Sequence, residues 1–256
     1  MQLIRNMKSF LKKILPFTLK QKLLDVIHPD KLVNERVKFY STFLTANDLV
    51  FDVGANLGNR VAAFLKIDAK VVAVEPQTNC HQYLKSKFGS KIFIVPKGLG
   101  AKEEVKNMFI SDAHTLSSFS TDFIESMKAS GRFSQHNWEK IQKIEITTLD
   151  NLIAQFGCPK FIKIDVEGYE EEVLKGLSTK VNYISIEYAV PEQLHKAIAC
   201  LQSLIKRDPN LTCNYCIGES MEFKLDNWAP GKEFILFIQT PEFIESEFGD
   251  IYIKMA

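Results

Sequence analysis

From residue 48 to the C-terminus, short apolar runs rich in β-branched residues alternate with segments whose apolar residues recur at helical spacing. Strands are predicted at 49–53, 70–75, 92–95, 161–165, 183–187, 213–217 and 233–239. Helices are predicted at 58–68, 77–88, 168–177 and 192–207. Such alternation is typical of βαβ units, and strands that are apolar throughout are typical of a sheet covered by helices on both faces. The sequence therefore predicts an α/β fold with a mainly parallel seven-stranded sheet.

Residues 1–46 follow a different pattern and are predicted to form an N-terminal helical extension to a domain over residues 47–256. Apolar residues recur there at helical spacing with lysines between them. We favour a helical cap packed on the domain, because few of these positions are aromatic. The alternative is that residues 8–27 form a basic amphipathic helix that makes a peripheral contact with an anionic membrane.

The stretch 111–143 interrupts the alternation of strands and helices. It is rich in Ser, His, Phe and Asn, and a long irregular stretch inside a domain usually has a function. We predict an insertion over the carboxyl edge of the sheet that acts as a lid or contacts the substrate.

Composition excludes several classes of protein. A net charge of +1 over 256 residues lacks the basic footprint of a nucleic-acid-binding protein. No run approaches the ~18 consecutive apolar residues of a membrane span, and the N-terminus lacks the features of a signal peptide. Five scattered cysteines suit a reducing compartment. We therefore expect a cytoplasmic protein, and the sequence does not indicate its oligomeric state.

The first predicted strand passes into a helix through the segment DVGANLG, which contains Asp52, Gly54, Asn56 and Gly58. In doubly wound sheets, ligands bind at the carboxyl ends of the strands, so this turn is expected to face a ligand. The dinucleotide fingerprint G-x-G-x-x-G needs its middle glycine to admit a diphosphate. Asn56 stands at that position, which weakens the case for a dinucleotide.

The second predicted strand ends in Glu75, which lies 23 residues after Asp52. An acid at this distance can accept hydrogen bonds from both hydroxyls of a ribose. A ribose-binding acid without a turn that admits a diphosphate favours S-adenosylmethionine over NAD. We expect the ribose of this cofactor on Glu75 and its amino-acid end over Gly54.

Charged residues gather at the end of the fourth predicted strand, where Lys163, Asp165 and Glu167 alternate with apolar residues. The first and fourth strands are neighbours in this architecture, so these side chains should face the Gly54 turn. Burying them is costly unless they pair with one another or contact a ligand. We favour a functional site, and a purely structural network of the lysine and the carboxylates is the alternative.

The sequence resembles the FkbM family of S-adenosylmethionine-dependent methyltransferases. The matching segments lie in the family's order between about residues 47 and 190, and they are FDVGANLG (51–58), VEP (74–76), TLSSF (115–119), TTLDNLI (147–153), FIKIDVEGYEEEVLKG (161–176) and ISIE (184–187). The resemblance implies a Rossmann-like methyltransferase fold. It also implies methylation of a hydroxyl on a sugar, glycolipid, polysaccharide or secondary metabolite, that is, a small-molecule or glycan acceptor. The cofactor-binding residues that it implies are Asp52, Gly54, Asn56, Gly58, Glu75, Pro76, Ser118 and Asp165.

Methyl transfer to a hydroxyl needs a base or a metal, because a hydroxyl is a poor nucleophile at pH 7. Asp165 is the first candidate base, with Glu167, Lys163 and Glu187 as residues that orient it or shift its pKa. His114 is a second candidate base. A divalent cation held by Asp165 and Glu187 is a less favoured alternative.

Two other classes of protein stay open. An NAD-dependent oxidoreductase would also use a strand, a turn and an acid, although the missing middle glycine counts against it. A non-catalytic S-adenosylmethionine-binding protein on this fold would be expected to lack the Asp165–Glu167 cluster, and here the cluster is intact.

Overall fold

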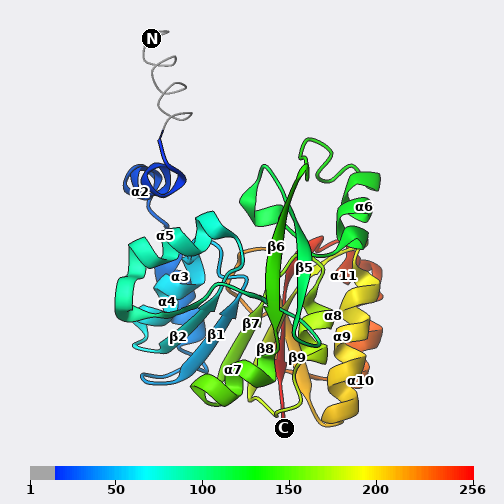
Figure 1. The fold of residues 1–256 in the computed structure, drawn as a ribbon. Helices are drawn as coiled ribbons and strands as arrows, with labels where there is room; N and C mark the ends of the chain where they lie inside the picture. Colours follow the sequence, from blue (N-terminus) through cyan, green and yellow to red (C-terminus); the bar gives the residue numbers. More distant parts are fainter. Residues whose placement is uncertain (1–14) are drawn as a thin grey trace.

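The computed structural model describes residues 15–256, so residues 8–14 of the predicted amphipathic segment lie outside it. An eight-stranded sheet forms the centre of the molecule, in the order β10-β9-β11-β8-β7-β1-β2-β3 (Figure 1). Its strands are β1 (Leu49–Val53), β2 (Lys70–Val74), β3 (Phe93–Val95), β7 (Phe161–Ile164), β8 (Tyr183–Ala189), β9 (Thr212–Ile217), β10 (Ala229–Pro230) and β11 (Phe248–Lys254). The pairs from β3 through β8 are parallel, whereas β11 runs antiparallel to both of its neighbours.

Helices cover both faces of this sheet. Adjacent residues of a strand point to opposite faces, and here both faces are apolar, so each face packs against helices. Val50 and Phe161 pack with α3 (Val33–Tyr40) and α4 (Asn59–Lys66), next to α5 (Thr78–Phe88). Phe51 and Ile162 pack in the opposite layer. That layer contains α7 (Leu149–Phe156), α8 (Glu170–Lys175), α9 (Leu194–Arg207) and α10 (Gly231–Phe237), and α11 (Pro241–Ile244) follows α10. The predicted Rossmann-like α/β fold is confirmed.

The predicted count of seven strands is wrong. The main sheet has eight strands, because the two-residue β10 adds to its edge, and a second sheet has three. The predicted strand at 233–239 is largely the helix α10, where Phe234 and the C-cap residue Ile238 are buried four residues apart while Leu236 is exposed. A short apolar run does not distinguish a buried strand from a helix. The strand that occupies the sheet instead is β11.

The second sheet contains β4 (Gly98–Leu99), β5 (Glu104–Ile110) and β6 (Lys140–Thr147). Residues 111–139 connect β5 to its antiparallel partner β6, so the predicted insertion at 111–143 ends inside a strand. This connection includes the helix α6 (Thr121–Ala129).

The N-terminal residues that the structure describes form α2 (Phe17–Ile27) and α3. In α3, Phe39 and Tyr40 are buried in the core against α4 and β7, so this helix is part of the domain's packing. In α2, only Gln21 is buried. Within residues 15–256, no helix combines the length and the apolar character needed to cross a bilayer.

Candidate active site

The ends of β1 and β7 meet as the sequence predicts. Asp52 pairs with Lys163 in parallel register, and the backbone N–H of Asp165 donates to the carbonyl of Val53 at 3.0 Å. Gly54 therefore lies directly beside Asp165. A Cβ on Gly54 would lie 1.8 Å from the carbonyl oxygen of Asp165, and the φ of Gly54 is +84°. The chain's own packing thus requires this glycine, whatever ligand approaches the turn.

Packing within the chain also explains why position 58 is a glycine. Its φ is +78°, and a Cβ there would lie 2.4 Å from the ring of Phe88 on α5. Gly58 does not line the cavity at the strand ends, whereas Gly54 does. The two glycines of the motif therefore differ in their relation to a ligand.

A cavity lies at the carboxyl ends of β1, β2 and β7. The sequence-predicted residues that line it are Asp52, Gly54, Asn56, Glu75, Pro76, His114, Lys163, Asp165 and Glu167. Side chains that sequence reasoning missed also line it, among them Gln77, Leu99, Met108, Phe119 and Tyr169. Ser118 and Glu187 do not line it.

Glu75 is buried at the end of β2, with 2% of its surface exposed. Its Oε2 accepts from the backbone N–H of Asn56 and its Oε1 from that of Gln77, both at 2.8 Å. Burial raises the pKa of Glu75 to about 7, against the opposing effect of these two N–H groups. A carboxylate has about four acceptor positions, so Glu75 keeps two for a ligand.

The connection between β5 and β6 covers one side of the cavity. The carbonyl of His114 accepts from the side-chain amides of Asn56 and Gln77, at 3.3 and 2.8 Å, which holds the connection against the segments that follow β1 and β2. The imidazole of His114 packs edge-to-face against Phe17, and burial lowers its pKa. Ser118 donates to the carbonyl of Glu167 at 2.6 Å. Ser118 therefore positions the backbone beside the site, outside the cavity.

Lys163 is almost fully buried, and its Nζ contacts Oδ2 of Asp165 at 2.5 Å. Burial acts to lower the pKa of Lys163, but the carboxylates of Asp165 and Asp250 outweigh it and raise the pKa above its usual value. Lys163 thus stays positively charged at neutral pH and pairs with Asp165.

Three carboxylates come together in front of this lysine. Asp165, Glu167 and Glu187 each place an oxygen within 4.8 Å of the others. Burial, and next the charge of Asp165, raises the pKa of both Glu167 and Glu187. Such a group can share protons, or it can hold a divalent cation through oxygen ligands.

The backbone at Glu167 is strained, with a φ of +55° in a residue other than glycine. The next residue, Gly168, has a φ of +82°. Glu170 supports the turn, because its Oε1 accepts from the N–H groups of Val166 and Gly168 at 3.0 and 3.3 Å. Strain of this kind is most common at functional sites.

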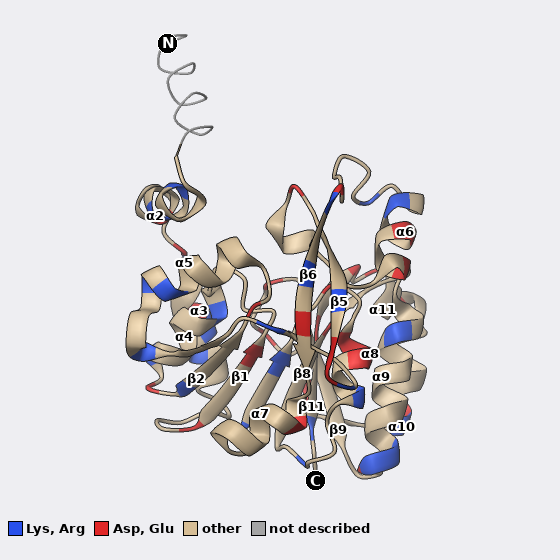
Figure 2. Ribbon diagram, viewed as in Figure 1, with Lys and Arg blue, Asp and Glu red and all other residues tan. Residues whose placement is uncertain are grey.

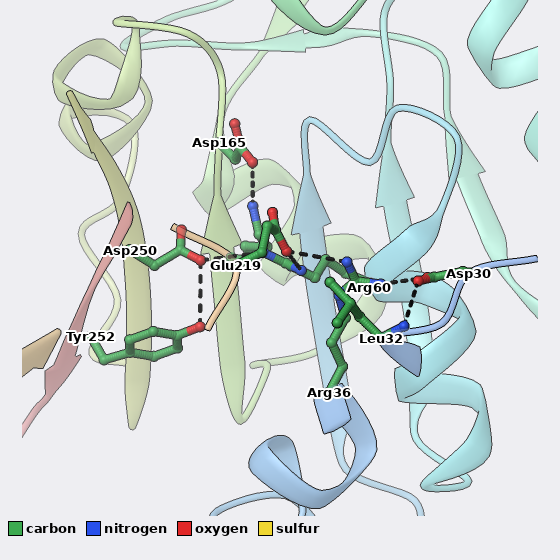
Figure 3. Close-up of polar contacts among 9 residues, drawn as sticks. Asp30, Leu32, Arg36, Arg60, Asp165, Glu219, Asp250 and Tyr252 are labelled. Carbon is green, nitrogen blue, oxygen red and sulfur yellow. Dashed lines mark hydrogen bonds and ion pairs between the residues drawn. The ribbon is translucent and has the colours of Figure 1, made fainter. Parts of the chain in front are cut away.

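An ion-pair network borders the same cavity, and its two arginines, Arg36 and Arg60, are buried (Figure 3). Glu219 accepts from Arg60 Nη2 at 3.0 Å and from Arg36 Nη2 at 3.1 Å. Arg60 also lies 3.6 Å from Asp250, and Arg36 pairs with Asp30. Burial acts to raise the pKa of Glu219, but the two guanidinium groups lower it to about 2. Sequence reasoning missed this network, and no local pattern marks it, because its members are far apart along the chain.

The chain is similar to known methyltransferases. The model of the "Methyltransferase FkbM domain" family matches residues 52–204. The chain is 28% identical over 148 residues to the hexuronic acid methyltransferase AglP of Haloferax volcanii. This match covers 55% of the chain and 56% of AglP, so the chain spans little more than half the length of that relative.

Solved structures similar to this chain include two methyltransferases. One is a TehB-like SAM-dependent methyltransferase from Corynebacterium glutamicum, with 10% identity, a TM-score of 0.47, and coverage of 93% of this chain and 95% of that one. The other is a putative O-methyltransferase from Klebsiella pneumoniae, with 9% identity, a TM-score of 0.44, and coverage of 97% and 94%.

Proposed function

The chain belongs to the FkbM family of S-adenosylmethionine-dependent methyltransferases, and we propose that it methylates a hydroxyl oxygen of a sugar-containing acceptor. One observation carries the proposal. A single cavity joins Glu75, with its two free acceptor positions, at the end of β2 to the Asp165 carboxylate at the end of β7, the two strands that flank β1. The sugar acceptor is supported by the relative AglP, whose name describes a hexuronic acid as the molecule methylated.

The residues present suit S-adenosylmethionine. Glu75 would accept hydrogen bonds from both hydroxyls of the ribose, and the amino-acid end of the cofactor would lie over the turn at Gly54. Asp52 is 1% exposed, and its Oδ2 makes no hydrogen bond within residues 15–256. A buried acceptor without a partner is costly, and a donor group of the ligand would satisfy it.

Asp165 would act as the general base. When bound, S-adenosylmethionine supplies an electrophilic methyl carbon next to a sulfonium. Asp165 would take the proton of the acceptor hydroxyl, whose oxygen would bond to the methyl carbon as the carbon–sulfur bond breaks and S-adenosylhomocysteine leaves. This transfer would need the oxygen and the methyl carbon about 3 Å apart. Lys163 orients the Asp165 carboxylate from behind, through the 2.5 Å contact. The raised pKa of Glu187 allows it to be protonated and to donate a hydrogen bond near Asp165.

Ligand-induced thermal shifts test the choice of cofactor. At about 100 times its Kd, a cofactor stabilises the folded state by ~2.7 kcal/mol, which for a chain of this size raises Tm by roughly 5–10 °C. We expect this shift with S-adenosylmethionine and with S-adenosylhomocysteine, and none with NAD. A shift with NAD alone would instead favour the oxidoreductase, and binding of S-adenosylmethionine without turnover on any sugar would favour a non-catalytic protein.

Glu75 gives a prediction about pH. Hydroxyl groups that donate hydrogen bonds favour the ionised carboxylate. Ligand binding should therefore lower the pKa of Glu75 from about 7, its value in the protein without ligand. The affinity for S-adenosylhomocysteine is therefore expected to be full above pH 7 and to fall as the pH is lowered below it. Titration calorimetry from pH 5.5 to 8 measures this, and in Glu75→Ala the inflection near pH 7 should be absent.

A ligand lacking one hydroxyl separates ribose binding from a structural role of Glu75. Each hydrogen bond to the carboxylate is worth ~1.5–3 kcal/mol, so Glu75→Ala should weaken S-adenosylhomocysteine binding at least roughly tenfold. The 2′-deoxy analogue should bind the wild type more weakly than the parent ligand, whereas Glu75→Ala should bind both equally. If removal of the 2′-hydroxyl cost the same affinity in both proteins, Glu75 would not contact the ribose.

A further inference from the structure

The helix α2 exposes apolar side chains on one face. Among the described residues, ten large apolar side chains are exposed, and four of them lie on this helix of 11 residues. They are Leu19, Leu23, Val26 and Ile27, whose exposed fractions are 51%, 52%, 80% and 56%. Their spacing of four, three and one places them on one side of the helix. Exposed apolar residues are ordinary when scattered, but a contiguous patch usually marks an interaction surface.

The opposite face of α2 is attached to the domain largely through polar groups. Gln21 is buried, the carboxylate of Asp25 accepts from the hydroxyl of Tyr83, and it pairs with Lys87 at 2.9 Å. A surface helix normally turns its apolar stripe inward. In α2 the polar contacts face inward and most of the aliphatic side chains face solvent, so packing on the domain does not account for the stripe.

The charges on α2 indicate what covers this stripe. Lys20 and Lys22 flank it, and the acid within the helix, Asp25, is already paired with Lys87. Lysines of α2 appear in blue in Figure 2. The sequence before α2 adds Lys8, Lys12 and Lys13. An apolar stripe flanked by lysines is complementary to a bilayer with anionic headgroups.

The position of α2 relates this surface to the cavity. Phe17, at the start of α2, packs edge-to-face against His114, with 5.9 Å between the ring centroids. His114 lines the cavity. Figure 1 shows α2 beyond the carboxyl ends of β1 and β2. A surface that contacts the stripe would therefore lie on the side of the molecule where the cavity is.

We propose that α2 docks this protein on an anionic lipid bilayer, with Leu19, Leu23, Val26 and Ile27 inserted at the level of the headgroups. Docking in this way requires no membrane span. It goes beyond the proposed methyl transfer, because it concerns where the enzyme works and does not depend on which acceptor it uses.

Vesicle flotation with the full chain tests the proposal. We expect binding to vesicles of phosphatidylcholine with 30% phosphatidylglycerol, with at least fivefold weaker binding to phosphatidylcholine alone and to the anionic vesicles in 0.5 M NaCl. The variant Leu23→Glu with Val26→Glu should lower the bound fraction at least tenfold. The matched control is Leu236→Glu on α10, a side chain 69% exposed, which should bind as the wild type does.

The folding control is the Tm of each variant and its affinity for S-adenosylhomocysteine, both of which should equal those of the wild type. The proposal is overturned if the wild type fails to float, or if the double variant floats as well as the wild type. It is also overturned if light scattering shows a wild-type dimer that the double variant converts to a monomer, because a second copy of the chain would then cover the stripe.

Discussion

Replacing Asp165 with asparagine is expected to lower kcat at least a hundredfold, while the affinity for S-adenosylmethionine changes less than severalfold. The amide keeps the volume of the side chain and an oxygen facing Lys163, but it cannot accept a proton. Loss of a general base typically costs ~10²–10⁴ in rate. The measurement is release of S-adenosylhomocysteine on one sugar acceptor, together with calorimetry of the cofactor.

Two controls support this experiment. Glu172→Gln removes a carboxylate on α8 that pairs with Lys175 on the surface, and it should leave kcat unchanged. Because Asp165→Asn removes the partner of a buried lysine, its Tm should be compared with that of the wild type before the rates are interpreted.

Chelation distinguishes a base from a metal ligand at the same site. If Asp165, Glu167 and Glu187 hold a divalent cation, EDTA should abolish the activity of the wild type, and Mg²⁺ or Mn²⁺ should restore it. With Asp165 as the base, EDTA should have no effect. An Asp165→Asn enzyme with near-normal kcat that is also insensitive to EDTA would contradict both models and would move the search to His114.

Gly54→Ala is expected to prevent folding rather than only to weaken cofactor binding. The added Cβ would lie 1.8 Å from the carbonyl oxygen of Asp165, and Gly54 and Asp165 directly follow the paired strands β1 and β7. Relief of the clash requires separation of β1 from β7. The free energy of unfolding should therefore fall by more than ~4 kcal/mol, which is among the largest effects of single substitutions. Circular dichroism and urea unfolding of the purified chain measure it.

Gly131→Ala is the matched control for this substitution. Gly131 also has a positive φ, of +82°, but a Cβ there would meet nothing within 4 Å. The substitution should lower the free energy of unfolding by only ~1–2 kcal/mol, which is the cost of placing a residue with a side chain in the left-handed conformation. A Gly54→Ala protein as stable as this control would show that the contact with Asp165 relaxes easily, and the glycine would then be explained by the cofactor.

The predicted site residues illustrate what sequence reasoning reaches. Glu75 and Asp165 follow strands whose apolar pattern is clear, and the carboxyl ends of parallel strands meet at one edge of a sheet. Their gathering around one cavity was therefore predictable. The role of Ser118 was not, because its contact with the backbone of Glu167 depends on how residues 111–139 fold back over the strands.

The C-terminal strands show the limits of local pattern. The strand β11 was missed because it contains Gly249 and a buried acid, Asp250, which interrupt the apolar run. The acid is tolerated there because Arg60 and Lys163 lie close to it. Its ion-pair partner Arg60 is supplied by α4, almost two hundred residues earlier in the chain.

The sequence by itself determined the α/β fold, the neighbouring positions of β1 and β7, and the acids at the ends of the strands. These follow from periodicity and from short motifs, which act over a few residues. Only the tertiary structure decided that Gly54 is required by the carbonyl of Asp165, that Arg36, Arg60 and Glu219 border the cavity, and that α2 turns its apolar stripe outward. Each of these depends on contacts between segments distant along the chain, and such contacts leave no local pattern because packing in three dimensions selects the partners.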